Sequence, residues 1–197
     1  MSGTFIVLEG PDGCGTTLHA RLLYERLKNE GMNVVPTFEP SNGPIGNEIR
    51  DILHSHKEIS PMELQQMFCD DRKWHVENVI EPALDKGKIV ISDRFFCSTI
   101  CYGTALGLSK DKMKDLNKDF IQPDQVFFLL PPFEVCRKRM GKRDKHDSLE
   151  DDSLQQKVYK EYQELAREHD FIKVIDSSGE KEEVASKIYE VITKMIK

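Results

Sequence analysis

Strand-forming and helix-forming segments alternate along all 197 residues, and this order predicts an α/β fold. The apolar runs are short and rich in β-branched residues, as in strands that are buried on both faces of a parallel sheet. The segments between these runs are long enough to be crossover helices. A glycine-rich turn joins the first expected strand to the first expected helix. We therefore expect a five-stranded parallel sheet wrapped by helices, in a three-layer sandwich.

The elements follow from local signals. The first strand is expected at residues 5–8 (F-I-V-L), and the first helix at 17–27, where leucines recur with helical spacing. Pro61 opens a long helix predicted over 61–83, because proline is favoured in the first turn of a helix. The β-branched run 88–92 predicts a buried strand. Further strands are predicted at 34–35, 126–130 and 171–175. Further helices are predicted at 45–54, 96–106, 110–120, from 132 into the basic residues that follow, at 153–168 and at 180–196.

Length and composition favour one domain over residues 1–197, with 39% hydrophobic residues. No apolar run approaches the ~20 residues of a membrane span, and the first strand begins too early for a secretory signal. The five scattered cysteines form no zinc pattern, so we expect reduced thiols, most of them buried. These features predict a cytoplasmic protein. The net charge of −6 argues against a nucleic-acid surface.

The turn after the first strand has the layout of a phosphate-binding loop. Residues 9–17 read E-G-P-D-G-C-G-T-T, so Gly10 and Gly15 fit the spacing G-x-x-x-x-G-K-[ST]. Backbone N–H groups and the following helix N-terminus can hold an anion there, and the Thr17 hydroxyl stands at the magnesium position. Thr16, however, replaces the lysine. Loss of one charged donor can slow a reaction roughly 10²–10³-fold, so another cation must act or the protein is slow or inactive.

Asp93 and Arg94 follow the buried strand predicted at 88–92. Ligands of open parallel sheets bind at the carboxyl ends of the strands. A carboxylate at that position can hold magnesium, and an arginine can clamp phosphate oxygens in a bidentate manner. This pair is therefore a candidate part of a phosphate site.

Phe68 and Arg72 are four residues apart in the long predicted helix, so they share one helix face. A ring and a guanidinium on one face suit a planar base, since the ring can stack and the guanidinium can bond the base edge.

A basic cluster lies between residues 137 and 145, namely Arg137, Lys138, Arg139, Lys142, Arg143 and Lys145. The polar segment that includes it predicts a lid at about 137–152. An arginine brought in by such a lid can stabilise a transferring phosphoryl group. We expect this cluster to supply the positive charge that Thr16 does not.

Together these segments resemble the thymidylate kinase family of P-loop nucleoside monophosphate kinases. The resemblance rests on the loop at 9–19, on E-P-S-N-G-P-I-G at 39–46, on M-F-C-D-D-R-K-W-H at 67–75 and on D-R-F-F-C-S-T-I-C-Y-G at 93–103. It spans nearly the whole chain and implies a P-loop nucleoside-triphosphate hydrolase-like fold. It also implies transfer of the γ-phosphoryl group of ATP to dTMP with magnesium, giving dTDP, in a homodimer without nucleic-acid or membrane partners.

The resemblance also implies roles for individual residues. The ATP phosphates would be bound by Gly10, Asp12, Gly13, Cys14, Gly15, Thr16, Thr17 and Arg139. The acceptor nucleotide would be bound by Asp12, Phe68, Arg72, Arg94, Ser98, Thr99 and Tyr102. Ser177 would lie near the adenine, and Thr17 and Asp93 would serve magnesium. The catalytic residues would be Asp12, Asp93, Arg94 and Arg143.

Departures from the family pattern leave three hypotheses. Phe38 stands where the family often has an arginine, and Gly103 where it often has a glutamine near the base. The first hypothesis is an active dTMP kinase with charge supplied by the lid. The second is a weakly active or inactive nucleotide-binding relative, because of Thr16. The third is a kinase for another nucleoside monophosphate, because of Phe38 and Gly103. We favour the first.

Overall fold

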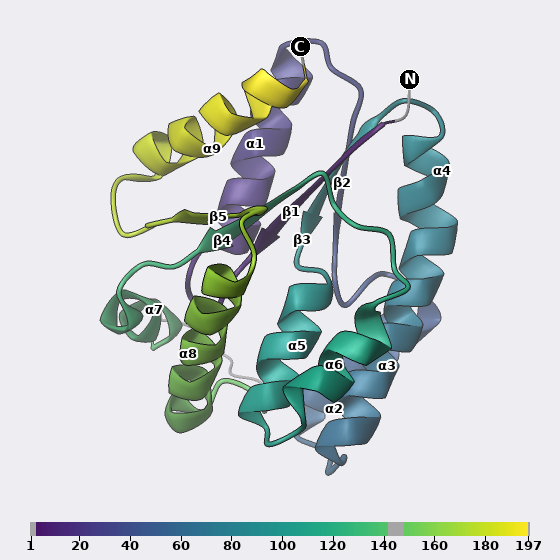
Figure 1. Ribbon diagram of the computed structural model, residues 1–197, viewed down its shortest axis with the longest axis vertical. Helices are drawn as coiled ribbons and strands as arrows, with labels where there is room; N and C mark the ends of the chain where they lie inside the picture. The colour runs from purple at the N-terminus through teal and green to yellow at the C-terminus, as the bar shows by residue number, and fades with distance from the viewer. Residues whose placement is uncertain (1–2, 142–147, 197) are drawn as a thin grey trace.

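The computed structural model describes residues 3–141 and 148–196, and its centre is one parallel sheet. The five strands have the order β2-β3-β1-β4-β5 (Figure 1). All four strand pairs are parallel, which confirms the predicted sheet. The strands are β1 (Thr4–Glu9), β2 (Val34–Phe38), β3 (Ile89–Asp93), β4 (Gln125–Leu129) and β5 (Ile172–Ile175). Because β1 lies between β3 and β4, the carboxyl ends of these three strands meet at one edge.

Helices connect the strands, and several begin with a side-chain cap. Ser60 and Glu63 form a capping box at α3, and Asp151 accepts a hydrogen bond from the Leu154 N–H at α8. The described helices are α1 (Thr16–Asn29), α2 (Pro44–Ser55), α3 (Pro61–His75), α4 (Glu81–Leu84), α5 (Phe96–Ala105), α6 (Lys110–Asn117), α7 (Phe133–Met140), α8 (Asp152–Glu168) and α9 (Lys181–Met195). The α1 helix has no side-chain cap, which leaves its first N–H groups available to a ligand.

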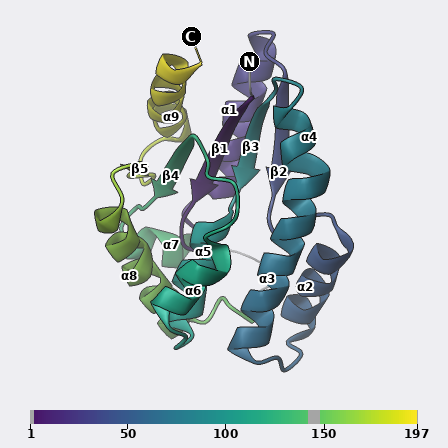
Figure 2. The same cartoon turned by 45° about the vertical axis from the view of Figure 1, so that its right-hand side comes forward.

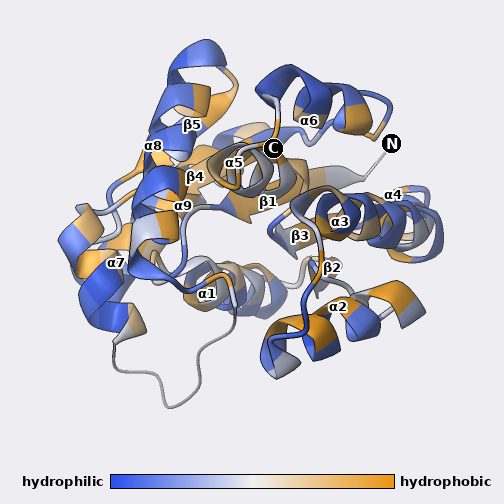
Figure 3. Cartoon of the chain, turned by 90° about the horizontal axis from the view of Figure 1, so that it is seen from below, coloured by the Kyte–Doolittle hydropathy of each residue, from blue (hydrophilic) through white to orange (hydrophobic). Residues whose placement is uncertain are grey.

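The two faces of the sheet carry separate hydrophobic clusters, because side chains alternate along a strand. In β1, Phe5 and Val7 join a cluster with residues of α5 and α8, while Ile6 and Leu8 join a cluster with residues of α1 and α9. Viewed from below, α1 lies on one side of the strands and α5 and α6 on the other (Figure 3). The chain thus forms the predicted three layers.

The chain is helical over the whole predicted range 61–83, but the helix is not a regular α-helix throughout. A π-helical turn, Val76–Ile80, separates α3 from α4, although the two helices continue as one rod (Figure 2). The Glu81 N–H bonds the Val76 carbonyl, five residues back. Pro82 has no N–H to donate and its ring crowds the preceding turn, so the regular ladder is interrupted just before it.

The five cysteines are free and buried, as the sequence predicts. Within 3–141 and 148–196, no helix combines the length and apolar character required to cross a membrane.

Candidate functional site

The loop between β1 and α1 has the backbone of an anion-binding turn. Gly13 and Gly15 adopt φ angles of 78° and 100°, in the left-handed region that favours glycine. A Cβ on Gly13 would also lie 2.5 Å from the Cys136 carbonyl oxygen, so a larger residue would not fit. The loop ends at the uncapped N-terminus of α1, where N–H groups and the helix dipole favour a negative charge.

Two arginines contact this loop. The Arg94 Nη1 donates to the Gly10 carbonyl oxygen at 2.7 Å, and the Arg139 Nη1 lies 3.4 Å from the carbonyl oxygens of Gly13 and Cys14. Thr16, in the lysine position, is 6% exposed. Arg139 belongs to the basic cluster that was expected to replace the lysine charge. Arg143 and the middle of the expected lid, residues 142–147, lie outside the described residues.

Thr17 and Asp93 lie at the start of α1 and the end of β3. The Thr17 Oγ1 donates to the Asp93 Oδ2 at 2.5 Å, and the buried Asp93 Oδ1 has no hydrogen-bond partner in the described part of the chain. That part holds no group of three or more His, Cys, Asp or Glu side chains able to bind a metal. A hydroxyl and one free carboxylate oxygen fit magnesium, which takes oxygen ligands and completes its shell with water and substrate phosphates.

A cavity of about 110 Å³ lies beside the loop and opens to solvent. It is bounded by α3, by the loop after β3 and by α5. All the residues predicted for the acceptor nucleotide line this one cavity: Asp12, Phe68, Arg72, Arg94, Ser98, Thr99 and Tyr102. Its other lining residues are Glu39, Pro40, Leu53, Gln65, Phe95 and Leu149.

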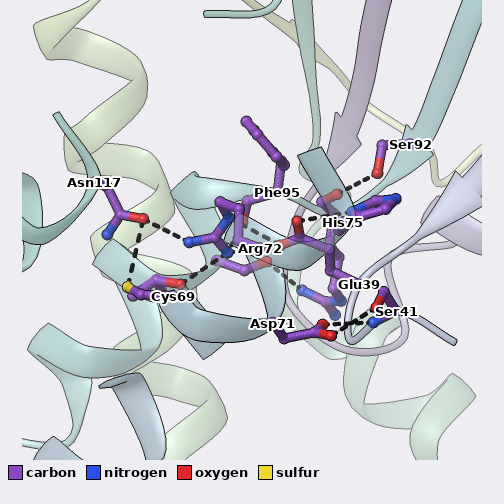
Figure 4. Close-up of polar contacts among 12 residues, drawn as sticks. Glu39, Ser41, Cys69, Asp71, Arg72, His75, Ser92, Phe95 and Asn117 are labelled. Carbon is purple, nitrogen blue, oxygen red and sulfur yellow. Dashed lines mark hydrogen bonds and ion pairs between the residues drawn. The ribbon is translucent and has the colours of Figure 1, made fainter. Parts of the chain in front are cut away.

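Arg72 is held in one orientation at the cavity wall (Figure 4). Its side chain is 1% exposed, and its Nε and Nη2 donate to the Glu39 Oε2 at 3.0 and 2.7 Å. Its Nη1 donates to the Asn117 Oδ1 at 2.5 Å, and its Nη2 also reaches the Thr99 Oγ1 at 3.0 Å. Burial lowers the pKa of Arg72, but Glu39, Cys69 and Glu9 together outweigh burial and the net pKa is raised. The guanidinium is therefore charged and fixed.

Arg94 joins the loop to the cavity. Its Nη2 donates to the Asp12 Oδ1 at 2.6 Å and its Nη1 to the Ser98 Oγ at 3.1 Å, besides the bond to Gly10. Burial lowers the pKa of Arg94, but Tyr102, Asp12, Tyr162 and Cys14 together outweigh burial, so the net pKa is raised and the guanidinium is charged. The φ angle of Arg94 is 72°, an uncommon conformation for a residue other than glycine, and such strain clusters at functional sites.

Sequence reasoning missed Gln155. This fully buried residue of α8 donates from its Nε2 to the Asp12 Oδ2 at 2.7 Å, and its Oε1 accepts from the Asp12 N–H at 3.2 Å. It holds one oxygen of the Asp12 carboxylate while Arg94 holds the other. The available signal was its place on the buried stripe of α8, with Val158, Tyr162 and Leu165, where a polar residue requires a partner.

Three residues singled out in the sequence do not line the cavity. The buried Ser177 hydroxyl donates to the Cys14 carbonyl oxygen at 2.7 Å, so Ser177 packs against the phosphate loop. Phe38 is 41% exposed and lies under the Arg50 guanidinium, 5.9 Å from the ring centre. Gly103 packs against Met113 and Gln65.

Comparison with known proteins agrees with this geometry. A family model described as thymidylate kinase matches residues 8–188. The chain is 37% identical to a probable thymidylate kinase of Thermococcus kodakarensis, with 98% of each chain covered. It is 34% identical to the thymidylate kinase of Exiguobacterium sibiricum, covering 100% of this chain and 97% of that one. A probable thymidylate kinase of Sulfurisphaera tokodaii is 36% identical over 98% of this chain and 97% of its own. With a phosphate loop, an adjoining cavity and near-complete coverage of these relatives, the chain belongs to the thymidylate kinase family.

Proposed function

We propose that this chain transfers the γ-phosphoryl group of ATP to dTMP, giving dTDP and ADP. The observation that carries the proposal is the position of Arg94. Its guanidinium contacts the phosphate loop through Gly10 and the cavity through Asp12 and Ser98. A donor phosphate chain on the loop and an acceptor phosphate in the cavity would therefore meet at one fixed positive charge. Membership of the family supports the same reaction.

On the acceptor side, the half-buried Phe68 ring would stack on the base and Arg72 would bond its carbonyl edge. Tyr102 would crowd the 2′ position of the sugar and so favour deoxyribose. Asp12 would accept from the 3′-hydroxyl. Arg94 would bind the acceptor phosphate and aim one of its oxygens at the loop. Ser98 and Thr99 complete this wall.

On the donor side, the loop N–H groups and the start of α1 would bind the ATP phosphates. Arg139, which contacts the loop, would add positive charge there. The adenine would lie near Ser177. Thr17 and Asp93 would hold magnesium, which when bound neutralises charge on the β- and γ-phosphates. A role for Arg143 in stabilising the transferring phosphoryl group stays a prediction.

The residues would act by positioning and by electrostatic stabilisation. An acceptor phosphate is already ionised at neutral pH, so it attacks without a general base. The fixed guanidinium of Arg94 would lower the repulsion between the two anions and align them. Gln155 would keep the Asp12 carboxylate in place, since it holds both the Asp12 N–H and its Oδ2.

An acceptor panel tests the proposal. Production of ADP would be measured with ATP, magnesium and each of dTMP, dUMP, dCMP, dAMP and dGMP, and binding of ATP and dTMP would be measured by calorimetry. We expect dTMP to give the highest kcat/KM. A clearly better acceptor would make the chain a kinase for another nucleotide. Binding without turnover would make it an inactive relative, and the absence of both dTMP binding and turnover would refute the proposal.

The assembly and the cellular location of the protein are also proposals. We propose a homodimer on the basis of the family resemblance, and light scattering after size-exclusion chromatography tests it: a monomer mass at micromolar concentration would refute it. Location in the cytoplasm stays a prediction.

A further inference from the structure

One side chain in the cavity wall has no hydrogen-bond partner. Gln65 is 0% exposed, yet neither its Oε1 nor its Nε2 has a partner among the residues that the structure describes. The charged groups around it are engaged, since Arg72 is bonded to Glu39 and Asn117. Buried amides in folded proteins are nearly always hydrogen-bonded, so an unpartnered one beside a cavity indicates a missing ligand.

The helix places Gln65 with the two residues assigned to the base. Gln65, Phe68 and Arg72 all lie in α3 and all line the cavity, three and seven residues apart along the helix. This spacing puts them on one face. A base stacked on Phe68 with one carbonyl toward Arg72 would present the neighbouring part of its edge to the Gln65 amide.

Helix α5 contributes no side chain at position 103. A Cβ added to Gly103 of α5 would lie 2.4 Å from the Met113 Sδ and 3.2 Å from the Gln65 Cγ. The Gly103 position is therefore filled by Met113 and by the stem of Gln65. The polar group available to the base at this end of the cavity comes from α3 instead.

We propose that Gln65 determines base specificity by pairing its side-chain amide with the imide edge of a pyrimidine. Its Oε1 accepts from the base N3–H, and its Nε2 donates to the adjacent carbonyl oxygen. A primary amide presents one acceptor and one donor side by side, which matches this edge. Arg72 only donates, so it fixes the orientation by requiring a carbonyl at its own position. This assignment rests on the proposed function.

The test compares dTMP with N3-methyl-dTMP, which lacks the N3–H, on the wild type and on Gln65→Met. Methionine keeps the length of the side chain and removes both polar atoms. We expect the wild type to bind dTMP about tenfold to a hundredfold more tightly than the methylated nucleotide, as two hydrogen bonds allow. We expect Gln65→Met to raise the KM for dTMP by a similar factor with little change in kcat, and to reduce the preference to within about threefold.

If Gln65 had only a structural role, its replacement would lower the Tm, whereas the binding role predicts a rise. Removal of an unsatisfied buried amide should raise the Tm of the nucleotide-free protein, by about 2–4 °C, even as dTMP binding weakens. Gln66→Met is the matched control, because Gln66 is exposed and bonds only Asp70 among the contacts seen, and it should leave dTMP binding unchanged. If Gln65→Met does not fold, the same titrations on Gln65→Leu replace it.

The outcomes separate this assignment from the proposed function. Equal binding of the two nucleotides by the wild type, or an unchanged KM and preference in Gln65→Met, would overturn the role of Gln65 while dTMP turnover left the function standing. If the wild type bound dTMP without turnover, the binding titrations would still decide on Gln65. If dTMP were not bound at all, the function and the assignment would both fail.

Discussion

Replacement of Arg72 by methionine tests the polar network at the cavity wall. Arg72→Met removes two charge-assisted hydrogen bonds to the Glu39 Oε2 and leaves that carboxylate, 3% exposed, with the His75 Nδ1 as its remaining side-chain partner in the described network. The Asn117 Oδ1 also loses its donor from Arg72. Breaking a buried ion pair by removing one partner costs about 3–5 kcal/mol. For a chain of this length, that corresponds to a fall in Tm of roughly 6–20 °C.

The assay is urea unfolding followed by circular dichroism, with the free energy of unfolding extrapolated to water. The pair Arg72→Met and Glu39→Gln completes a double-mutant cycle. We expect the double variant to be more stable than the sum of the single losses by about 1–3 kcal/mol, because it no longer holds an uncompensated buried carboxylate. Arg21→Met is the control: its ion pair with Glu25 is exposed, and its loss should cost about 0–1 kcal/mol.

The reasoning is refuted if Arg72→Met unfolds within about 1 kcal/mol of the wild type, or if the two single losses simply add. Either result would mean that the buried pair is solvated or that Glu39 finds another donor. The variant should also lose affinity for dTMP, but stability alone decides the argument about the network.

Three further predictions concern the phosphate loop and its surroundings. Arg139→Gln should lower kcat/KM for ATP by roughly 10²–10³-fold, whereas Lys173→Gln, at an exposed position of β5, should leave it unchanged; equal, small effects would contradict the assignment of Arg139. Thr16→Lys should raise kcat by less than about tenfold if the arginines already supply the charge, and steady-state kinetics showing a much larger gain would mean that the natural site lacks a cation. Burial raises the pKa of Glu9 above its ordinary 4.5, so the folded protein binds more protons than the unfolded chain between 4.5 and the raised value, and the free energy of unfolding should fall as the pH rises through that window. Glu9→Gln should lack this contribution, and a difference between wild type and variant that does not change between about pH 4.5 and 7.5 would disprove it.

The local elements and the phosphate loop could be predicted because their signals lie within a few residues. The spacing of Gly10 and Gly15 marks the turn, and the four-residue step from Phe68 to Arg72 puts both on one face of α3. The order of strands and helices along the chain likewise predicts the parallel sheet. The π-helical turn inside the long predicted helix was missed, although Pro82 was a signal for it.

The partners of these residues depended on tertiary structure. Arg72 meets Glu39 and Asn117 across 33 and 45 residues, and Gln155 meets Asp12 across 143 residues. Such contacts exist because the parallel strands end at one edge of the sheet, and strand order is not encoded in any local window. The sequence by itself therefore determined which chemical groups this protein carries and which of them share a helix face. Only the fold decided that Arg94 connects the loop to the cavity and that the Gln65 amide is left without a partner beside it.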